Sequence, residues 1–210
     1  MKHIDFYLDF VSPYAWLALE QMPQALEGLS YHLHFKPVLL GALLKQHANP
    51  GPAGIEPKRD WTYRHVRWLG HSTGVGLQMP TQHPFAPLPL LRLALATSHD
   101  GRINRHVARE LLRHVWQGGL DPLDPVRLQA LRDGLRLQHE PESEQVKAWL
   151  RANTDEAQQR GVFGVPSWWV DGQVFWGLDA LPMLRAYLQG DAWFDSAEGQ
   201  APEVRNGLKS

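Results

Sequence analysis

Residues 4–22 read IDFYLDFVSPYAWLALEQM and establish how the fold begins. Apolar and polar side chains alternate over residues 4–10, which is the period of a strand with one buried face. Ser12 and Pro13 follow directly, and serine suits the N-cap of a helix while proline suits its first turn. The stretch therefore predicts a strand over residues 4–10 and a helix over residues 14–27.

The chain next to this unit changes from a strand pattern to a long helical region. Residues 29–38 alternate again and predict a second strand, which should lie parallel to the first because a helix joins the two. Residues 41–57 are rich in glycine and proline and predict a long loop, a kind of segment that is often functional. No strand pattern occurs between residues 39 and 165. We expect helices over residues 58–71, 90–98, 103–117, 124–135 and 141–160.

Strand patterns return only near the end of the chain. Residues 167–170 and 173–176 are β-prone, and Asp171-Gly172 between them predicts a two-residue hairpin turn, followed by a helix over residues 179–189. The order β-α-β, then α-β-β-α, is that of a thioredoxin-like α/β domain. The helical middle of the chain then becomes a large all-helical insertion. We expect the thioredoxin-like domain to span residues 1–40 and 161–195, the insertion to span 41–160, and residues 196–210 to form a mobile tail.

Composition excludes several classes of function. The 210 residues are 43% hydrophobic and 20% charged with a formal net charge of -1, so no global field attracts nucleic acid or an anionic membrane. The N-terminus begins directly with a strand pattern, and no apolar run predicts a signal peptide or membrane span, so we expect a cytoplasmic protein. The sequence contains no cysteine, which excludes disulfides, thiolate metal sites and a protein thiol nucleophile.

The missing cysteines matter most at the start of the first helix. In the thioredoxin fold the redox pair C-x-x-C begins this helix, whereas here Ser12 and Ala15 occupy the two cysteine positions. Dithiol exchange by the protein is therefore impossible. Free backbone N–H groups and the positive end of the helix still favour an anion beside Ser12. If that anion is a thiolate, a ligand must supply it.

Two later segments carry further candidate groups. Val165-Pro166 stands just before a strand that we expect at an edge, and a cis bond there would turn the backbone groups of Val165 outward to pair with an extended peptide ligand. Asp179 opens the last helix, where it either caps the helix or receives an ammonium group. Taken alone, the Ser12 start and Asp179 are ordinary helix caps, and only their combination with Val165-Pro166 favours a ligand site.

These segments together resemble a known family. They look like 2-hydroxychromene-2-carboxylate isomerases and kappa-class glutathione transferases, which belong to the DsbA-like branch of the thioredoxin superfamily. The similarity extends over nearly the whole chain to Trp193, with the motifs in the same order. The four segments are DFVSPYAW at residues 9–16, KPVLLG at residues 36–41, GVFGVP at residues 161–166 and FWGLD at residues 175–179.

The resemblance implies glutathione as cofactor and assigns roles to individual residues. Ser12 would hydrogen-bond the glutathione sulfur as the catalytic residue, and Val165, followed by Pro166, would pair its backbone with the cysteinyl part. Leu178 and Asp179 would receive the γ-glutamyl carboxylate and ammonium groups. The remaining assignments are Asn49 and Lys58 for the sulfur and the glycyl end, and Lys36 for the carboxylate of the second substrate. Apart from the resemblance, Trp176 is a candidate wall for an aromatic substrate, because it clusters with Trp168 and Trp169 near the expected ligand edge.

The resemblance favours one reaction and leaves two alternatives. We expect a glutathione-dependent isomerase that interconverts 2-hydroxychromene-2-carboxylate and an open-chain hydroxybenzylidenepyruvate-type α-keto acid by reversible thiolate addition. Its partner would be a small aromatic carboxylate, with no nucleic acid or membrane, and the protein could form a homodimer. The alternatives are a kappa-like glutathione transferase or peroxidase acting on electrophiles, and a catalytically silent thioredoxin-fold protein that binds peptides.

Metal binding is the weaker interpretation of the eleven histidines. His32 and His34 share one strand face, but the sequence places no third ligand near them, so we expect no metal site.

Overall fold

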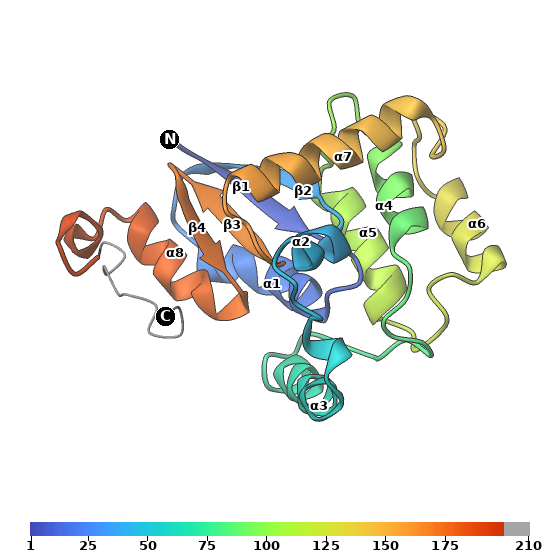
Figure 1. The fold of residues 1–210 in the computed structure, drawn as a ribbon, viewed down its shortest axis with the longest axis horizontal. Helices are drawn as coiled ribbons and strands as arrows, with labels where there is room; N and C mark the ends of the chain where they lie inside the picture. Colours follow the sequence, from blue (N-terminus) through green and yellow to red (C-terminus); the bar gives the residue numbers. More distant parts are fainter. Residues whose placement is uncertain (200–210) are drawn as a thin grey trace.

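A four-stranded mixed sheet lies at the centre of the protein, whose computed structural model describes residues 1–199 (Figure 1). The sheet order is β2-β1-β3-β4, with β1 parallel to β2 as predicted and β3 antiparallel to both of its neighbours. The prediction that β3 lies at an edge is wrong, because β1 pairs with one side of it and β4 with the other. The strands are β1 (Lys2–Leu8), β2 (Tyr31–Pro37), β3 (Ser167–Val170) and β4 (Gln173–Trp176).

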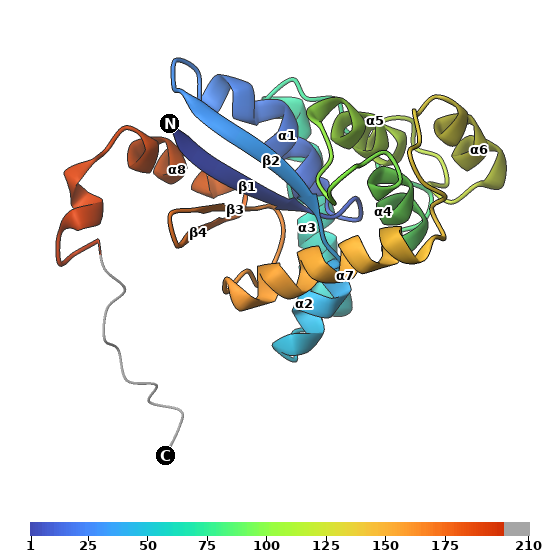
Figure 2. The same cartoon turned by 90° about the horizontal axis from the view of Figure 1, so that it is seen from above.

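Helices cover both faces of this sheet. Figure 2 shows α1 (Pro13–Ala25) and α7 (Glu144–Gln159) on opposite sides of the strands. The alternation of β1 explains the arrangement: Phe6 belongs to the core shared with α1, and its neighbour Tyr7 belongs to a second core that includes Ala157 of α7. Both side chains are fully buried. The prediction of one buried face is therefore wrong, because both faces of β1 are buried, each in its own hydrophobic layer.

The segment after β2 corrects the prediction of a continuous loop over residues 41–57. Its first part is helix α2 (Leu40–Gln46), followed by a short 3-10 turn at Pro52–Gly54. No side chain of α2 caps its own start. Instead, the Leu40 N–H donates to the Asp9 carboxylate at 2.9 Å, and the Leu39 N–H donates to the Thr154 hydroxyl at 3.1 Å. Distant residues thus satisfy the free N–H groups of this helix.

The middle of the chain is helical, as expected. Asn104, Asp124 and Ser143 each cap a helix with a side-chain oxygen, so the predicted helices exist with ends shifted by a few residues. Within residues 1–199 no strand forms in this region. Its helices are α3 (Glu56–Ser72), α4 (Leu88–Leu95), α5 (Arg105–Trp116) and α6 (Pro125–Asp133). The fold is thus a thioredoxin-like domain with a large helical insertion, while the exact domain boundaries stay a prediction.

The C-terminal part completes the thioredoxin-like unit. The predicted hairpin turn is confirmed, with positive φ angles of 47° at Asp171 and 86° at Gly172. A 3-10 turn, η2 (Leu178–Ala180), precedes the last helix α8 (Leu181–Leu188), and η3 (Ala192–Asp195) follows it. Residues 196–199 of the expected tail form a turn, and residues 200–210 lie outside the described part of the chain.

Candidate functional site

Ser12 lies at the junction between β1 and α1 and is almost completely buried. Its Oγ accepts the Ala15 N–H at 3.3 Å, so it caps α1 as the sequence predicts. The same Oγ donates to the Val165 carbonyl at 3.4 Å, across 153 positions of sequence. That distance exceeds the usual range for an O–H donor, so a better acceptor can replace the Val165 carbonyl as the partner of this hydrogen bond at little cost.

Val165 and Pro166 lie beside Ser12, joined by the expected cis peptide bond. Strand pairing begins only at Ser167, so the backbone of Val165 remains outside the ladder even though β3 is internal. The Val165 N–H donates no hydrogen bond within residues 1–199. The Pro166 carbonyl accepts the Gly177 N–H at 2.9 Å, which ties this segment to η2.

Leu178 and Asp179 come to the same place through η2, which contacts α1. Leu178 packs against the main core, whereas Asp179 is exposed. The cap interpretation of Asp179 is wrong, because neither η2 nor α8 has a side-chain cap. Its carboxylate forms no hydrogen bond or ion pair in the described part of the chain. The lack of a side chain at Gly177 leaves room for the Asp179 carboxylate, since a Cβ at residue 177 would lie 2.5 Å from the Asp179 Oδ1.

Tyr14 connects Asp179 with α3. Burial and the negative charge of Asp179 raise the pKa of Tyr14, so its phenol stays protonated at neutral pH. Its hydroxyl lies 2.9 Å from the Nδ1 of His65. No sequence pattern indicates a role for either residue, because the position of α3 beside the start of α1 depends on tertiary structure.

Asp9 directly follows β1, three residues before Ser12, and is fully buried. Its two carboxylate oxygens accept the N–H groups of Val11 at 3.2 Å and Leu40 at 2.9 Å, and its carbonyl accepts the Ser12 N–H at 3.1 Å. Burial raises the pKa of Asp9 to about 7, against the lowering effect of these backbone donors. Asp9 is not among the predicted site residues, although a carboxylate at the end of a buried strand is an unusual sequence feature.

Asn49 lies on the connection between α2 and α3, and Lys58 lies in the first turn of α3. The Asn49 Oδ1 accepts the Gly51 N–H at 2.9 Å, and the Lys58 side chain is exposed with no ion pair within residues 1–199. No described contact joins either side chain to Ser12. Their predicted roles at the sulfur and the glycyl end stay predictions.

Trp176 lies at the end of β4 and borders the segment that contains Val165. It is 52% exposed, and its ring centroid lies 4.9 Å from that of Phe163. A Cβ at Gly164 would lie 2.7 Å from the Trp176 Nε1, so the glycine allows the indole to approach the backbone closely. The position suits an aromatic contact near the site, but its role stays a prediction.

Lys36 belongs to a separate cluster of charged groups. Its Nζ lies 2.5 Å from Glu156 and 3.4 Å from Asp5, and only 12% of its side chain is exposed. Arg160 and the His34 ring also contact Asp5. The ammonium group of Lys36 is therefore already paired with two carboxylates, which leaves it poorly placed to receive a substrate carboxylate.

The structure thus gathers three of the predicted sites around the start of α1: Ser12, the backbone of Val165 and the carboxylate of Asp179. Each offers a group that has a weak hydrogen bond or none: the Ser12 hydroxyl, the Val165 N–H and the Asp179 carboxylate. Such a set can bind a small zwitterionic peptide with its thiolate at the helix N-terminus. Over residues 1–199 no helix is long and apolar enough to span a membrane, and no group of three or more metal-ligating side chains could hold an ion.

Comparisons with known proteins show the family and the fold of the chain. A family profile described as a DSBA-like thioredoxin domain matches residues 3–189. The chain is 30% identical over 195 residues to a 2-hydroxychromene-2-carboxylate isomerase of Sphingobium xenophagum, covering 89% of this chain and 98% of that protein. It is 25% identical over 209 residues to glutathione S-transferase kappa 2 of Caenorhabditis elegans, covering 89% and 92%. A solved 2-hydroxychromene-2-carboxylate isomerase superposes with a TM-score of 0.73 at 21% identity, covering 95% of this chain and all of that one.

Proposed function

The chain belongs to the family of DSBA-like thioredoxin domains, and from this premise we propose that it is a glutathione-dependent isomerase of the 2-hydroxychromene-2-carboxylate type. The observation that carries the proposal is Ser12. In a chain without cysteine, this hydroxyl stands at the N-terminus of α1, where it accepts the Ala15 N–H at 3.3 Å and donates only a long 3.4 Å contact to the Val165 carbonyl. A site of this kind suits a sulfur that the ligand brings.

Three groups of the structure fit the parts of glutathione. The Ser12 hydroxyl would donate to the sulfur, and the free N–H of Val165 would pair with the cysteinyl backbone. The unpaired carboxylate of Asp179 would receive the γ-glutamyl ammonium group. None of these groups has to break a strong internal contact first, which is the main support for this assignment.

The electrostatics of the site are sufficient to hold a thiolate. A free thiol has a pKa near ~8.5, and lowering it by about 2 units requires roughly 2.7 kcal/mol. A helix N-terminus supplies about 1 kcal/mol, and a hydrogen bond to a charged acceptor about 1.5–3 kcal/mol. Ser12 and α1 can therefore stabilise the thiolate without a general base.

Glutathione supplies the reactive sulfur, which would add to the conjugated double bond of an aromatic α-keto acid, leave a single bond free to rotate, and be eliminated unchanged. The chain itself holds the anion and keeps water away from it. The Tyr14 hydroxyl lies 2.9 Å from the Nδ1 of His65, and when that nitrogen is the donor, the hydroxyl can donate its own proton to an oxygen of a bound ligand.

A kappa-like transferase is the second candidate, favoured by the relative named glutathione S-transferase kappa 2. It would use the same thiolate but keep the sulfur bonded to the electrophile. The silent peptide-binding protein needs only the free Val165 backbone and leaves the exposed carboxylate of Asp179 without a purpose.

One experiment separates the three candidates. The protein is titrated with glutathione while ultraviolet absorbance reports thiolate, and is then given a hydroxybenzylidenepyruvate. The isomerase converts the keto acid and leaves the glutathione concentration unchanged, whereas a transferase consumes glutathione as a conjugate. If glutathione neither binds nor forms a thiolate, both enzyme proposals fail and the peptide-binding protein remains.

A further inference from the structure

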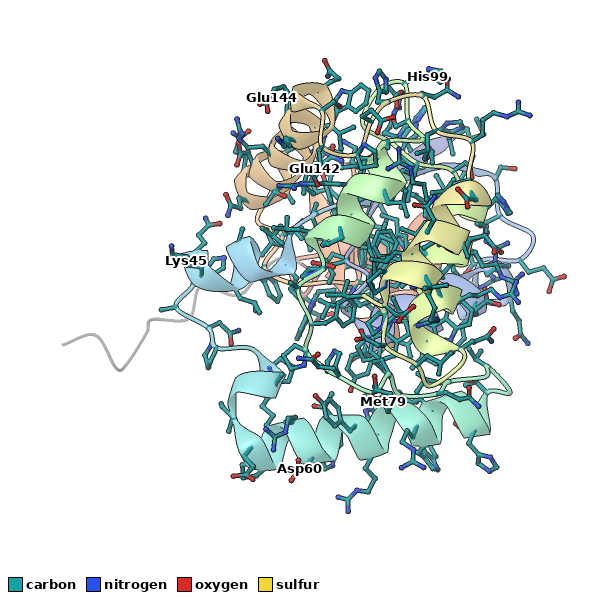
Figure 3. All side chains as sticks on the ribbon, turned by 90° about the vertical axis from the view of Figure 1, so that its right-hand side faces the viewer. Lys45, Asp60, Met79, His99, Glu142 and Glu144 are labelled. Atoms are coloured by element: carbon teal, nitrogen blue, oxygen red, sulfur yellow. The ribbon has the colours of Figure 1, made fainter. Side chains whose placement is uncertain are left out.

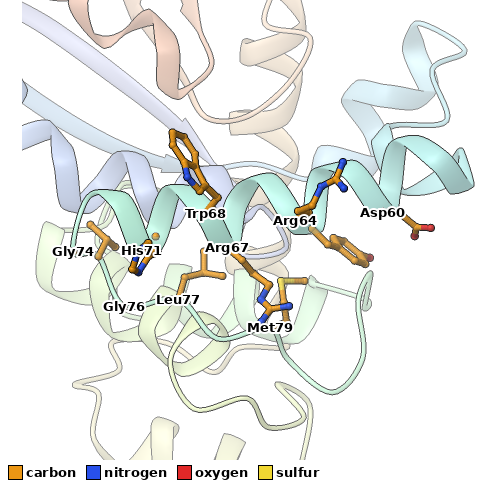
Figure 4. Close-up of a pocket in the computed structure, with 12 residues that line it drawn as sticks. Asp60, Arg64, Arg67, Trp68, His71, Gly74, Gly76, Leu77 and Met79 are labelled. Carbon is orange, nitrogen blue, oxygen red and sulfur yellow. The ribbon is translucent and has the colours of Figure 1, made fainter.

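The connection between α3 and α4, residues 73–87, brings a histidine to the turn that precedes Ser12. Figure 3 places Met79, which belongs to this connection, between α3 and the other helices. Figure 4 shows the same residue beside the groove that α3 and the connection enclose. Four residues further along the chain is His83, whose imidazole Nε2 lies 2.8 Å from the Val11 carbonyl oxygen.

The turn over residues 9–12 leads directly into α1. The Ser12 N–H donates to the Asp9 carbonyl at 3.1 Å, which closes the turn. The Phe10 carbonyl accepts the indole N–H of Trp116, a fully buried residue of α5, at 3.0 Å. The helical part of the chain therefore already holds one carbonyl of this turn.

His83 holds a second carbonyl of the turn, and with it the peptide group that precedes Ser12. The carbonyl of this peptide group belongs to Val11 and faces the His83 Nε2, and its N–H belongs to Ser12 and donates to Asp9. The peptide plane therefore cannot rotate without breaking a hydrogen bond. Because this plane sets the direction in which the Ser12 side chain leaves the backbone, His83 controls where Oγ points.

The partners of His83 determine which ring nitrogen carries the proton. A carbonyl oxygen only accepts hydrogen bonds, so Nε2 must be the donor to Val11. The Nδ1 lies 2.8 Å from the Tyr63 hydroxyl of α3, and burial lowers the pKa of His83. The neutral ring with its proton on Nε2 fits both partners, because Nδ1 then accepts from Tyr63.

The surroundings leave the His83 ring little freedom to move. Its centroid lies 5.3 Å from the ring of Tyr63, 6.4 Å from that of Phe85 and 5.4 Å from that of Trp116, each in an edge-to-face arrangement. The Tyr63 hydroxyl also lies 2.9 Å from the His83 carbonyl oxygen. The donor to Val11 is therefore held in place before any ligand binds.

We propose that His83 is a positioning residue, which holds the turn before α1 so that the Ser12 hydroxyl points at the sulfur of bound glutathione. The inference rests on the proposed function, because it concerns how that thiolate site keeps its shape. The Ser12 Oγ itself has only long contacts, at 3.3 Å with the Ala15 N–H and 3.4 Å with the Val165 carbonyl. Such contacts are too weak to fix the hydroxyl, so its direction depends on the backbone that His83 holds.

Replacement of His83 by phenylalanine tests this role. His83→Phe removes the donor to Val11 but keeps a planar ring among its aromatic neighbours. In the folded variant the pKa of bound glutathione should rise by about 0.5–1 unit, which is part of the about 1–2 units expected from complete loss of the Ser12 hydrogen bond. In acidic buffer, where the thiol is protonated, the Kd for glutathione should change less than about threefold, because Asp179 and the Val165 N–H still bind it.

Rescue by glutamine separates positioning from a general effect on the fold. The amide nitrogen of glutamine can reach the place of the histidine Nε2 and donate to the Val11 carbonyl. His83→Gln should therefore keep the thiol pKa within about 0.3 units of the wild-type value. A thiol pKa raised as much by His83→Gln as by His83→Phe would overturn the proposal.

A double variant shows whether His83 acts through Ser12. If it does, His83→Phe should leave the thiol pKa unchanged in the Ser12→Ala background, because the hydroxyl that His83 directs is gone. Equal increases of the pKa in both backgrounds would overturn the proposal, since His83 would then act independently of Ser12.

His114 of α5 provides a matched control. Its Nε2 lies 2.9 Å from the Pro122 carbonyl oxygen, and burial lowers its pKa, as it does for His83. No contact in the described part of the chain joins the His114 side chain to the turn before Ser12. His114→Phe should therefore lower the melting temperature, as His83→Phe does, and leave the thiol pKa unchanged. An equal rise of the thiol pKa in both variants would overturn the positioning role.

Nitrogen NMR of the wild type decides the matter if His83→Phe does not fold. In protein labelled at the histidine nitrogens and kept in neutral buffer, His83 should carry its proton on Nε2 and none on Nδ1. A proton on Nδ1 alone would overturn the proposal, because Nε2 could not then donate to Val11.

Failure of the proposed function gives a different result from failure of this inference. If the wild type lowers the pKa of bound glutathione and folded His83→Phe lowers it equally, the positioning role is overturned while the proposed function stands. If glutathione forms no thiolate on the wild type, the proposed function fails, and the positioning role fails with it.

Discussion

Replacement of Ser12 by alanine gives the most direct test of the site. The change removes two contacts of Oγ: the cap bond from the Ala15 N–H at 3.3 Å and the weak donation to the Val165 carbonyl at 3.4 Å. Loss of a serine cap lowers the free energy of unfolding by about 1 kcal/mol. The fold should therefore persist, because a domain of this kind is stable by about 5–15 kcal/mol.

The effect on the bound thiol should be larger than the effect on the fold. The hydrogen bond from Ser12 to a thiolate belongs to the class worth about 1.5–3 kcal/mol. Since one pKa unit corresponds to about 1.36 kcal/mol, its loss should raise the pKa of bound glutathione by about 1–2 units. From a bound pKa of about 6.5, this lowers the thiolate fraction at pH 7 roughly three- to twentyfold, and the turnover rate should fall with it.

The assay is a spectroscopic pH titration of the glutathione complex together with thermal unfolding. Ser143→Ala is the matched control, because Ser143 caps α7 by accepting the Val146 N–H at 3.4 Å and has no described contact with the Ser12 site. The control should lose a similar amount of stability and no thiolate. An unchanged thiolate pKa in a folded Ser12→Ala protein would refute the reasoning.

Three further changes address neighbouring parts of the site. Asp179→Asn should weaken glutathione roughly ten- to hundredfold by calorimetry with no change in melting temperature, because Asp179 caps no helix; unchanged affinity would contradict its ammonium role. Ser12→Cys should form a single mixed disulfide with glutathione disulfide, releasing one glutathione thiolate, since Ala15 offers no second thiol; absence of the adduct by mass spectrometry would count against a sulfur beside residue 12. Burial holds the pKa of Asp9 at about 7 in the folded state, against ~3.9 in the unfolded state, so between these pH values the folded state binds more protons and the free energy of unfolding should fall as pH rises. Asp9→Asn should remove this contribution to the pH dependence of stability, measured by denaturant titration at several pH values. An equal pH dependence in both proteins would disprove the raised pKa of Asp9.

The local pattern of the chain was sufficient for most of the fold. Three local patterns predicted elements that the structure confirms, because each depends on contacts between residues close in sequence. They are the alternation over residues 4–10, the Ser12-Pro13 helix start and the Asp171-Gly172 turn. The first strand begins and ends two residues earlier than predicted, at Lys2–Leu8, because Asp9 leaves the ladder to bond α2. Sequence motifs also identified Ser12, Val165 and Asp179, which the fold brings together at one place.

Other features depend on contacts that no local pattern contains. Helix α2 begins without a cap of its own and is completed by Asp9 and Thr154, so its sequence resembles a loop. The internal position of β3 follows from its pairing with both β1 and β4. A strand read alone indicates its buried face but not its neighbours, because hydrogen bonds between strands are made by the backbone, whatever the side chains.

The same distinction applies to the side chains around the site. The sequence alone determined that this protein has no thiol and that a helix N-terminus with a serine stands where the redox pair would be. Only the tertiary structure paired Lys36 with two carboxylates, joined Tyr14 to His65, and left the Asp179 carboxylate without an ion pair within residues 1–199. Residue type specifies which interactions a group can make, whereas long-range packing decides which of them are already satisfied and which remain for a ligand.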